Sequence, residues 1–167
     1  MHARPVESTL VGMVWPRYAV AVLWLAVVLF LGGSYFAAHN TAVLVLPVLK
    51  VFVPHASLRQ LNAIHAVVRK VAHLTEYAIL ALLWFRALIL SGRRTGRAAA
   101  WIALGVCLLC AFADEGHQST LPTRSGSARD FVIDSSGAVA ALMLVRARRT
   151  PGDRATLAAS VAVEPAD

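Results

Sequence analysis

The sequence predicts an all-α protein: a polytopic transmembrane bundle of four spanning helices, with one interfacial or re-entrant segment before the second span. Of its 167 residues, 58% are hydrophobic and only 15% are charged, whereas soluble domains are about half apolar and a quarter charged. The apolar residues gather into runs close to the roughly 20 helical residues that cross a hydrocarbon core of about 30 Å. None of these runs alternates in the way that membrane-barrel strands do.

The first predicted span covers residues 18–38. Arg4 and Arg17 precede it, as basic residues precede the apolar part of a signal peptide. The apolar run is too long for a signal peptide, however, and it ends without a small-x-small cleavage site. We therefore expect an uncleaved anchor helix that follows a cytoplasmic segment at residues 1–17.

The segment at 41–54 is apolar but too short to span a bilayer, and Pro47 and Lys50 interrupt it. It fits an interfacial segment or a re-entrant one, and the sequence leaves both open. Residues 56–70 follow with apolar side chains at helical spacing. This spacing predicts an amphipathic helix that leads into the second span.

The other three spans are predicted at residues 71–90, 98–113 and 131–145. Such apolar runs must be helical, because a bilayer offers no hydrogen-bond partners to their backbone amides. Together with the first span they complete a membrane domain at 18–145. Residues 146–167 form a basic tail rich in charged and small residues, which we expect to be cytoplasmic and loosely ordered.

The formal net charge of +7 indicates orientation rather than a nucleic-acid partner, because the basic residues flank the apolar runs. With a cytoplasmic N-terminus, nine basic residues lie inside and six outside, with Arg86 near the inner edge. Both termini of this multi-pass cell-membrane protein are therefore predicted to be cytoplasmic. Cys107 and Cys110 lie within an apolar run, and two thiols define neither a disulfide framework nor a zinc site.

Acidic residues gather at the outer ends of the predicted spans. Five of the nine acids belong to this group: Glu76, Asp114, Glu115, Asp130 and Asp134. Asp134 lies twelve residues before Arg146, which places it about 12 Å below the outer surface of the hydrocarbon core. Carboxylates at that depth are costly, so they are expected to face the bundle interior and to mark a site.

Helical spacing brings several polar residues onto shared faces. His65, Arg69 and His73 follow one another at intervals of four, and Glu76 or Tyr77 continues the stripe. Two further pairs lie at helical spacing, Asp114 with Gln118 and Asp130 with Asp134. Arg124 is a cation on the loop between these pairs. A forked guanidinium at Arg124 would suit a buried carboxylate or a phosphate.

Four motifs in this region carry a family resemblance. They are Lys-Val-Ala-His-Leu-Thr-Glu-Tyr-Ala-Ile-Leu at 70–80, Asp-Glu-Gly-His-Gln at 114–118, Pro-Thr-Arg at 122–124, and Asp130-x-x-x-Asp134-x-x-Gly137. In order and spacing the sequence resembles the VanZ-like family of small bacterial membrane proteins. Many relatives have Asn where this chain has Asp134, and a second glycine where it has Ala141. The small-xxx-small spacing that favours close helix packing is retained.

The motifs and the resemblance together predict a ligand-binding site. Its expected members are Lys70, His73, Glu76, Tyr77, Asp114, Glu115, Gln118, Arg124, Asp130 and Asp134. The candidates for catalytic proton transfer are His73, Glu76, Glu115 and Asp130. No motif identifies a cofactor or a metal, although the Glu and Asp oxygens could hold a divalent cation. A simpler reading makes His73 with Glu76 a packing pair, and the acids at 114–115 a helix cap.

Three functions fit these residues. One is an acid/base or metal-assisted enzyme that acts on a lipid headgroup at the outer leaflet. Another is a binding or shielding protein for a lipid-linked envelope precursor or a lipoglycopeptide, and the resemblance favours it because the family's namesake is associated with teicoplanin resistance. A small transporter ranks last, because four spans without an inverted repeat are few for a transport pathway. Membrane lipids are the expected partners in each case.

Overall fold

The computed structural model describes residues 7–92, 95–120 and 127–148, with side chains from residue 17 onward. These residues form five α-helices and a short 3₁₀ helix, η1, and this confirms the all-α prediction. In chain order the elements are α1 (Glu7–Leu31), η1 (Ser34–Phe36), α2 (Ala38–Phe52), α3 (Leu58–Leu90), α4 (Gly96–Ser119) and α5 (Ala128–Arg148).

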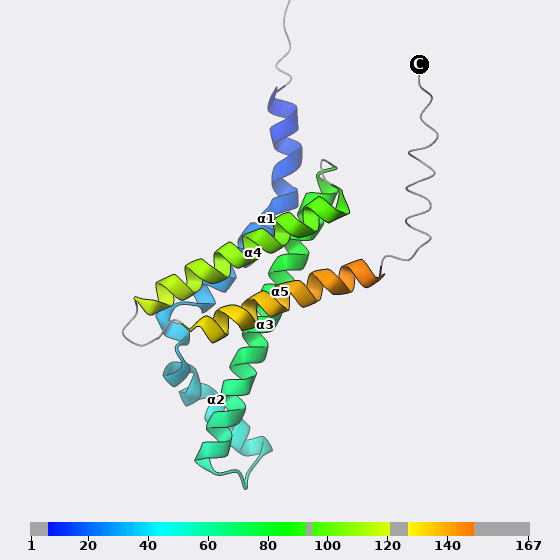
Figure 1. Cartoon of the computed structure of the whole chain (residues 1–167). Helices are drawn as coiled ribbons and strands as arrows, with labels where there is room; N and C mark the ends of the chain where they lie inside the picture. Colours follow the sequence, from blue (N-terminus) through cyan, green and yellow to red (C-terminus); the bar gives the residue numbers. More distant parts are fainter. Residues whose placement is uncertain (1–6, 93–94, 121–126, 149–167) are drawn as a thin grey trace, which may run out of the picture.

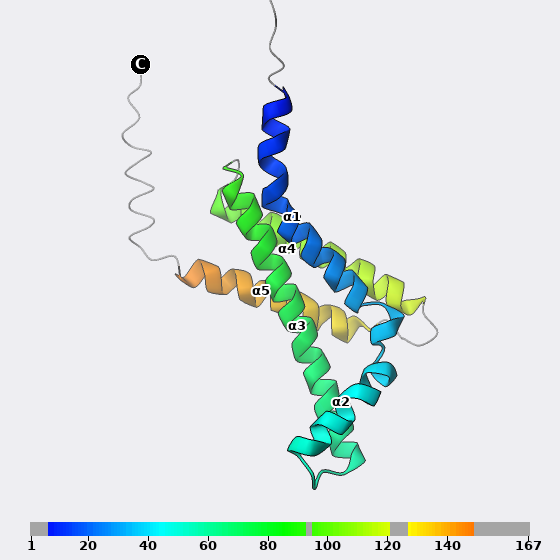
Figure 2. The same cartoon turned by 180° about the vertical axis from the view of Figure 1, so that it is seen from behind.

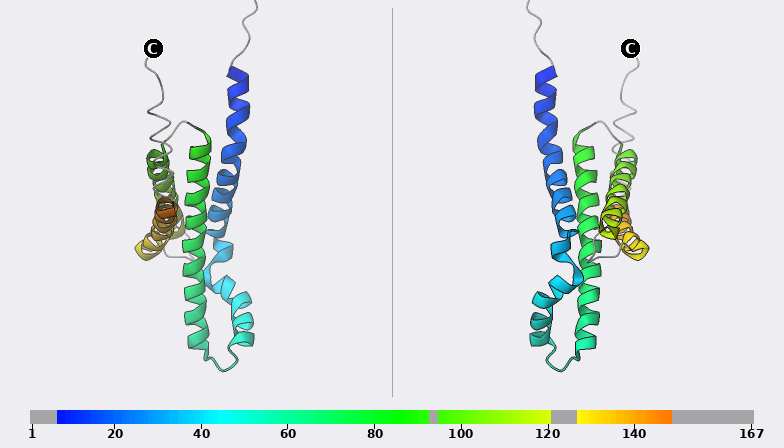
Figure 3. Two further views of the ribbon diagram at one scale, coloured as in Figure 1. Left: turned by 90° about the vertical axis from the view of Figure 1, so that its right-hand side faces the viewer. Right: turned by 90° about the vertical axis from the view of Figure 1, so that its left-hand side faces the viewer.

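The long helix α3 is the centre of the arrangement, and it packs against α1, α2, α4 and α5 (Figures 1 and 2). On one side of α3, α1 lies along its C-terminal half and α2 along its N-terminal half (Figure 3). On the other side lie α4 and α5, which also pack against each other.

The start of α3 is fixed by a reciprocal capping box. The hydroxyl of Ser57 accepts a hydrogen bond from the Gln60 amide, and the Gln60 side chain accepts one from the Ser57 amide. From there the helix runs for 33 residues, about 50 Å. The segments predicted separately at 56–70 and 71–90 are thus one helix, which exceeds a 30 Å hydrocarbon core unless it tilts strongly.

The segment predicted as one anchor helix at 18–38 is divided in the structure. Helix α1 ends at Leu31, and η1 follows two glycines later. The apolar segment at 41–54 is a helix, α2, which packs on α3 and whose Lys50 Nζ donates to the Ala56 carbonyl at 3.0 Å. Glycine offers no side chain to hold a helix together, and this explains the break that hydropathy alone did not show.

Two of the described helices, α3 and α4, are long and apolar enough to cross a membrane. The part of α1 from Arg17 to Leu31 and the whole of α2 are shorter apolar helices. Four spans, their boundaries and the cytoplasmic orientation of both termini stay predictions. The tail beyond residue 148 and the first six residues lie outside the described residues.

The core where α1, α3, α4 and α5 meet is rich in small side chains. Ala81, Ala99, Ala103 and Ala138 are fully buried there, beside Tyr77. Small residues let helix backbones approach closely, which is the main route to tight packing between membrane helices. One close approach is at Gly137 of α5, where a Cβ atom would overlap the backbone of Leu74 in α3.

Candidate functional site

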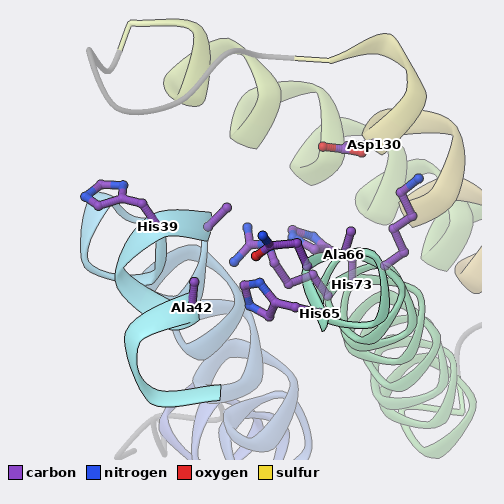
Figure 4. A pocket seen from close by; sticks show the side chains of 10 residues that line it. His39, Ala42, His65, Ala66, His73 and Asp130 are labelled. Carbon is purple, nitrogen blue, oxygen red and sulfur yellow. The ribbon is translucent and has the colours of Figure 1, made fainter. Parts of the chain in front are cut away.

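A pocket of about 550 Å³ opens between α2 and α3, with one residue from α5 at its edge (Figure 4). Its lining residues are Ala38, His39, Ala42, Asn62, His65, Ala66, Arg69, Lys70, His73 and Asp130. Two of these side chains are basic, three are imidazoles and one is a carboxylate. The pocket is therefore suited to an anion.

The α3 wall of the pocket follows from helical spacing. His65, Arg69 and His73 recur every four residues, so their side chains share the face that α2 covers. The opposite wall offers only Ala38, Ala42 and His39. Because alanine side chains are small, α2 can lie close to α3 and still leave open space between the helices.

Thr41 of α2 joins the two walls. Its hydroxyl lies 3.2 Å from His65 Nε2 and accepts a hydrogen bond from Arg69 Nη1 at 3.2 Å. The same Nη1 donates to the Phe36 carbonyl at 2.8 Å. The Thr41 hydroxyl also lies 3.2 Å from the Ala37 carbonyl, and the tautomer of the His65 ring determines whether Thr41 or His65 donates in their contact. This network holds the start of α2 against α3.

His73 contacts an acid deep in the bundle. Its Nδ1 lies 3.4 Å from Oδ1 of Asp134, a carboxylate on α5 that is 0% exposed. Within the described residues neither Asp134 oxygen has a hydrogen bond of good geometry. The His73–Asp134 contact is therefore electrostatic, at a distance slightly longer than a normal hydrogen bond. Gly137, one turn further along α5, makes the contact possible because it lets α5 approach Leu74.

Glu76 lies outside the pocket lining. Its backbone carbonyl accepts a hydrogen bond from Trp24 Nε1 at 3.0 Å, which ties α1 to α3. Its half-buried carboxylate is close enough to His73, Asp134 and Asp114 for their charges to interact. The closest acidic contact of His73 is with Asp134 on another helix, while Glu76 remains near enough for its charge to interact with His73.

A second polar cluster joins the ends of α1 and α4. Gln118 Nε2 donates to Asp114 Oδ2 at 2.7 Å, and both side chains are buried. A Cβ atom on Gly32, which follows α1, would overlap the Asp114 carboxylate. The absence of a side chain at Gly32 therefore lets this carboxylate lie against the backbone at the end of α1. Neither Asp114 nor Gln118 lines the pocket. Tyr77 does not line it either, because its ring is fully buried in the core.

Glu115 caps the start of α5. Its Oε2 accepts a hydrogen bond from the backbone amide of Ser127, the residue before that helix, and the Ser127 hydroxyl accepts one from the Arg129 amide. A carboxylate at this place also interacts favourably with the helix dipole. Arg124 lies outside the described residues. In the part of the chain that is described, no three His, Cys, Asp or Glu side chains form a group that could hold a metal ion.

Comparison with known families decides what kind of protein carries this pocket. Residues 17–149 match the sequence profile of the VanZ/LLP1 family. The chain belongs to the VanZ/LLP1 family. No curated protein and no solved structure matches it.

The VanZ/LLP1 match covers α2, α3, α4 and α5 and hence every pocket residue. The resemblance seen in the motifs is therefore confirmed, and the chain is a VanZ family membrane protein with α3 and α4 as candidate spans. Of the expected site residues, the structure brings Lys70, His73 and Asp130 into the pocket. The other described members of the expected set do not line the pocket.

Some pocket residues were not among the expected ligand-binding set. His65 and Arg69 were identified as part of the polar stripe on α3, but not as members of the site. His39, which lines the pocket, and Thr41, which bonds to two of the stripe residues, were not singled out either: His39 lies between the span predicted at 18–38 and the interfacial or re-entrant segment predicted at 41–54, and Thr41 begins that segment. The available signal was that His39, Asn40 and Thr41 are three consecutive polar residues where these two predicted segments meet.

Replacing Glu115 with alanine should destabilise the VanZ/LLP1 fold by about 1–2 kcal/mol, because loss of a capping acceptor typically costs that much. Glu115→Gln keeps an acceptor oxygen and should cost clearly less. Thermal unfolding of the detergent-purified protein measures both. His117→Ala, which removes an exposed side chain two residues further along α4, is the control. An equal loss of stability in Glu115→Ala and His117→Ala would contradict the capping role.

Proposed function

We propose that this protein binds the anionic headgroup of a lipid-linked cell-envelope ligand in the pocket between α2 and α3. The observation that carries the proposal is the charge of the lining, which has two basic side chains, Arg69 and Lys70, and a single carboxylate, Asp130. His39, His65 and His73 can add further donors or positive charge. A phosphate, with several acceptor oxygens and up to two negative charges, matches this set of donors better than a carboxylate does.

The apolar surface beside the pocket supports a lipid as the carrier of that anion. Val43, Leu44 and Val48 of α2 are exposed by 72%, 75% and 55%. The N-terminal half of α3 adds exposed Val67 and Val71. Because the headgroup site and this apolar surface share the same two helices, one amphiphilic molecule can occupy both.

The wider proposal keeps four spans, with both termini in the cytoplasm and the pocket at the outer leaflet. The excess of basic residues on the predicted cytoplasmic side supports this orientation. A protein that retains an envelope precursor at the outer leaflet would lower the access of glycopeptide antibiotics of the teicoplanin type to that precursor. Ligand retention in the pocket would in this way produce antibiotic tolerance.

Binding of phosphatidic acid, a lipid phosphomonoester, tests the proposal. We expect the protein in phosphatidylcholine nanodiscs to bind phosphatidic acid at least tenfold more tightly than diacylglycerol, which lacks the phosphate, and to bind it more weakly as salt is added. Lys70→Ala should weaken binding roughly fivefold to tenfold, since Lys70 is exposed and partly screened. Native mass spectrometry of the released complexes gives the occupancies.

Arg59→Ala is the matched control, because Arg59 is an exposed cation on α3 that does not line the pocket. It should leave the affinity for phosphatidic acid within twofold of the unmodified protein. Equal affinity for phosphatidic acid and diacylglycerol would show that the pocket does not recognise a phosphate. Equal losses in Arg59→Ala and Lys70→Ala would show that only the overall charge of α3 matters.

A further inference from the structure

His73 is the residue that joins the pocket to the buried interior. Its side chain lines the pocket (Figure 4) and is 19% exposed, while its Nδ1 lies 3.4 Å from the fully buried Asp134 carboxylate. The two residues come from different helices, α3 and α5. One ring nitrogen of His73 thus lies beside a buried acid, while the exposed part of the ring lines the pocket.

The buried carboxylate determines which nitrogen of His73 is available to a ligand. A carboxylate beside Nδ1 favours the tautomer that carries the proton on Nδ1, because that N–H points at the negative charge. The lone pair then lies on Nε2, the other ring nitrogen. An imidazole held in this way is suited to accept a proton from water or from a hydroxyl group.

The environment of Asp134 argues against a role in packing alone. A carboxylate without hydrogen bonds is expensive to bury, and more so in a bilayer. Asn at this position would fill the same volume without a charge. Because Gly137 has no side chain, α5 can lie against the Leu74 backbone, and this close packing places Asp134 beside His73. The contact between His73 and Asp134 therefore requires a buried charge and a glycine within α5, and both are unfavourable for stability.

We propose that His73 is the general base for hydrolysis of a lipid phosphomonoester in this pocket, with Asp134 as its positioning residue. The inference rests on the proposed function, since it requires the phosphate to bind beside Arg69 and Lys70. Those two cations would stabilise the charge on the phosphoryl oxygens as the reaction proceeds. The open pocket admits the water that the reaction consumes.

The step balances without a redox partner. The water oxygen forms a bond to phosphorus while the bond from phosphorus to the lipid oxygen breaks. One water proton passes to Nε2 of His73 and then to the departing lipid oxygen, and the other remains with the phosphate. The products are the lipid alcohol and inorganic phosphate, and His73 returns to its starting state.

Phosphate release from phosphatidic acid in nanodiscs tests this activity. The unmodified protein should release inorganic phosphate from phosphatidic acid and much less from glycerol 3-phosphate, its soluble counterpart. His73→Gln should lower kcat at least 100-fold, and Asp134→Asn at least tenfold, while phosphatidic acid binding stays within threefold. His55→Gln, which removes an exposed histidine outside the pocket, should leave kcat unchanged.

The outcomes separate the inference from the proposed function. Binding of phosphatidic acid without phosphate release would overturn the hydrolytic role and leave the binding function standing. Failure to bind would overturn the binding function itself. Equal hydrolysis of glycerol 3-phosphate would overturn the assignment of a lipid substrate. Unchanged kcat in His73→Gln would remove His73 from the reaction.

A measurement on the unmodified protein covers the case in which the variants do not fold. The ¹⁵N chemical shifts of the His73 ring, recorded where the imidazole is neutral, report which nitrogen carries the proton. We expect the proton on Nδ1, facing Asp134. A proton on Nε2 would overturn the assignment of His73 as a base directed into the pocket.

Discussion

Replacing Gly137 with alanine should separate α5 from α3 and destabilise the protein by about 1–3 kcal/mol, the usual cost of forcing an extra methyl group into a close-packed contact. A Cβ atom at this position would overlap the Leu74 carbonyl oxygen and carbon. These are backbone atoms of a long helix, so they cannot rotate away as a side chain would. The movement should also lengthen the contact between His73 and Asp134.

The matched control is the same substitution at Gly105 in α4, where a Cβ atom would meet nothing within 4 Å. Gly105→Ala should be neutral or stabilise the helix by up to about 1 kcal/mol, because alanine is the better helix former. Thermal unfolding of both variants in the same detergent makes the comparison. Equal stability of Gly137→Ala and Gly105→Ala would show that α3 and α5 are not in close contact at Gly137.

Replacing Arg69 with alanine should abolish phosphatidic acid binding, with a loss of at least 100-fold, because it removes both a pocket cation and the link to α2. The guanidinium donates to the Phe36 carbonyl and to the Thr41 hydroxyl. Charge-assisted hydrogen bonds contribute about 1.5–3 kcal/mol each. In Arg69→Ala the backbone amides at the start of α2 should exchange hydrogen for deuterium faster, because the bonds that hold this end of α2 to α3 are lost. Exchange in α4 should be unchanged, and mass spectrometry measures both.

Thr41→Val separates the two roles of Arg69. It removes the shared hydroxyl but leaves the charge in the pocket, so the start of α2 should exchange faster while most phosphate affinity is kept. Arg69→Lys keeps the charge without the forked geometry and should lie between Arg69→Ala and the unmodified protein. If Arg69→Ala bound phosphatidic acid normally, the pocket between α2 and α3 would not be the phosphate site.

The helices could be predicted from the sequence because their signals are local. The capping box at Ser57 and the apolar runs define α3 and α4 without knowledge of any neighbour. The left-handed turn after α3 also has a local mark, since Gly92 adopts a φ of 70° that other residues rarely adopt. Where a helix depended on contacts, as at α2, the sequence showed an apolar segment but not its partner.

The candidate site was predicted only in part, because spacing along one helix says nothing about the neighbouring helix. The stripe of His65, Arg69 and His73 could be read from the interval of four. That α2 covers this stripe, and that Thr41 bonds to two of its members, depends on how α2 folds back along α3. Spacing alone could suggest Glu76 as a partner of His73 on the same helix, but not the contact with Asp134, which lies on α5.

The sequence by itself determined the all-α class, the family, and the stripe of basic and imidazole side chains on one face of α3. These follow from composition, periodicity and motif order, which are properties of the chain alone. The tertiary structure decided the roles of two acids whose partners lie on other elements: Glu115 caps α5, and Asp134 faces His73. The physical reason is that a carboxylate takes its role from the donors around it, and here those donors are placed by helix packing at glycine contacts such as Gly137 with Leu74.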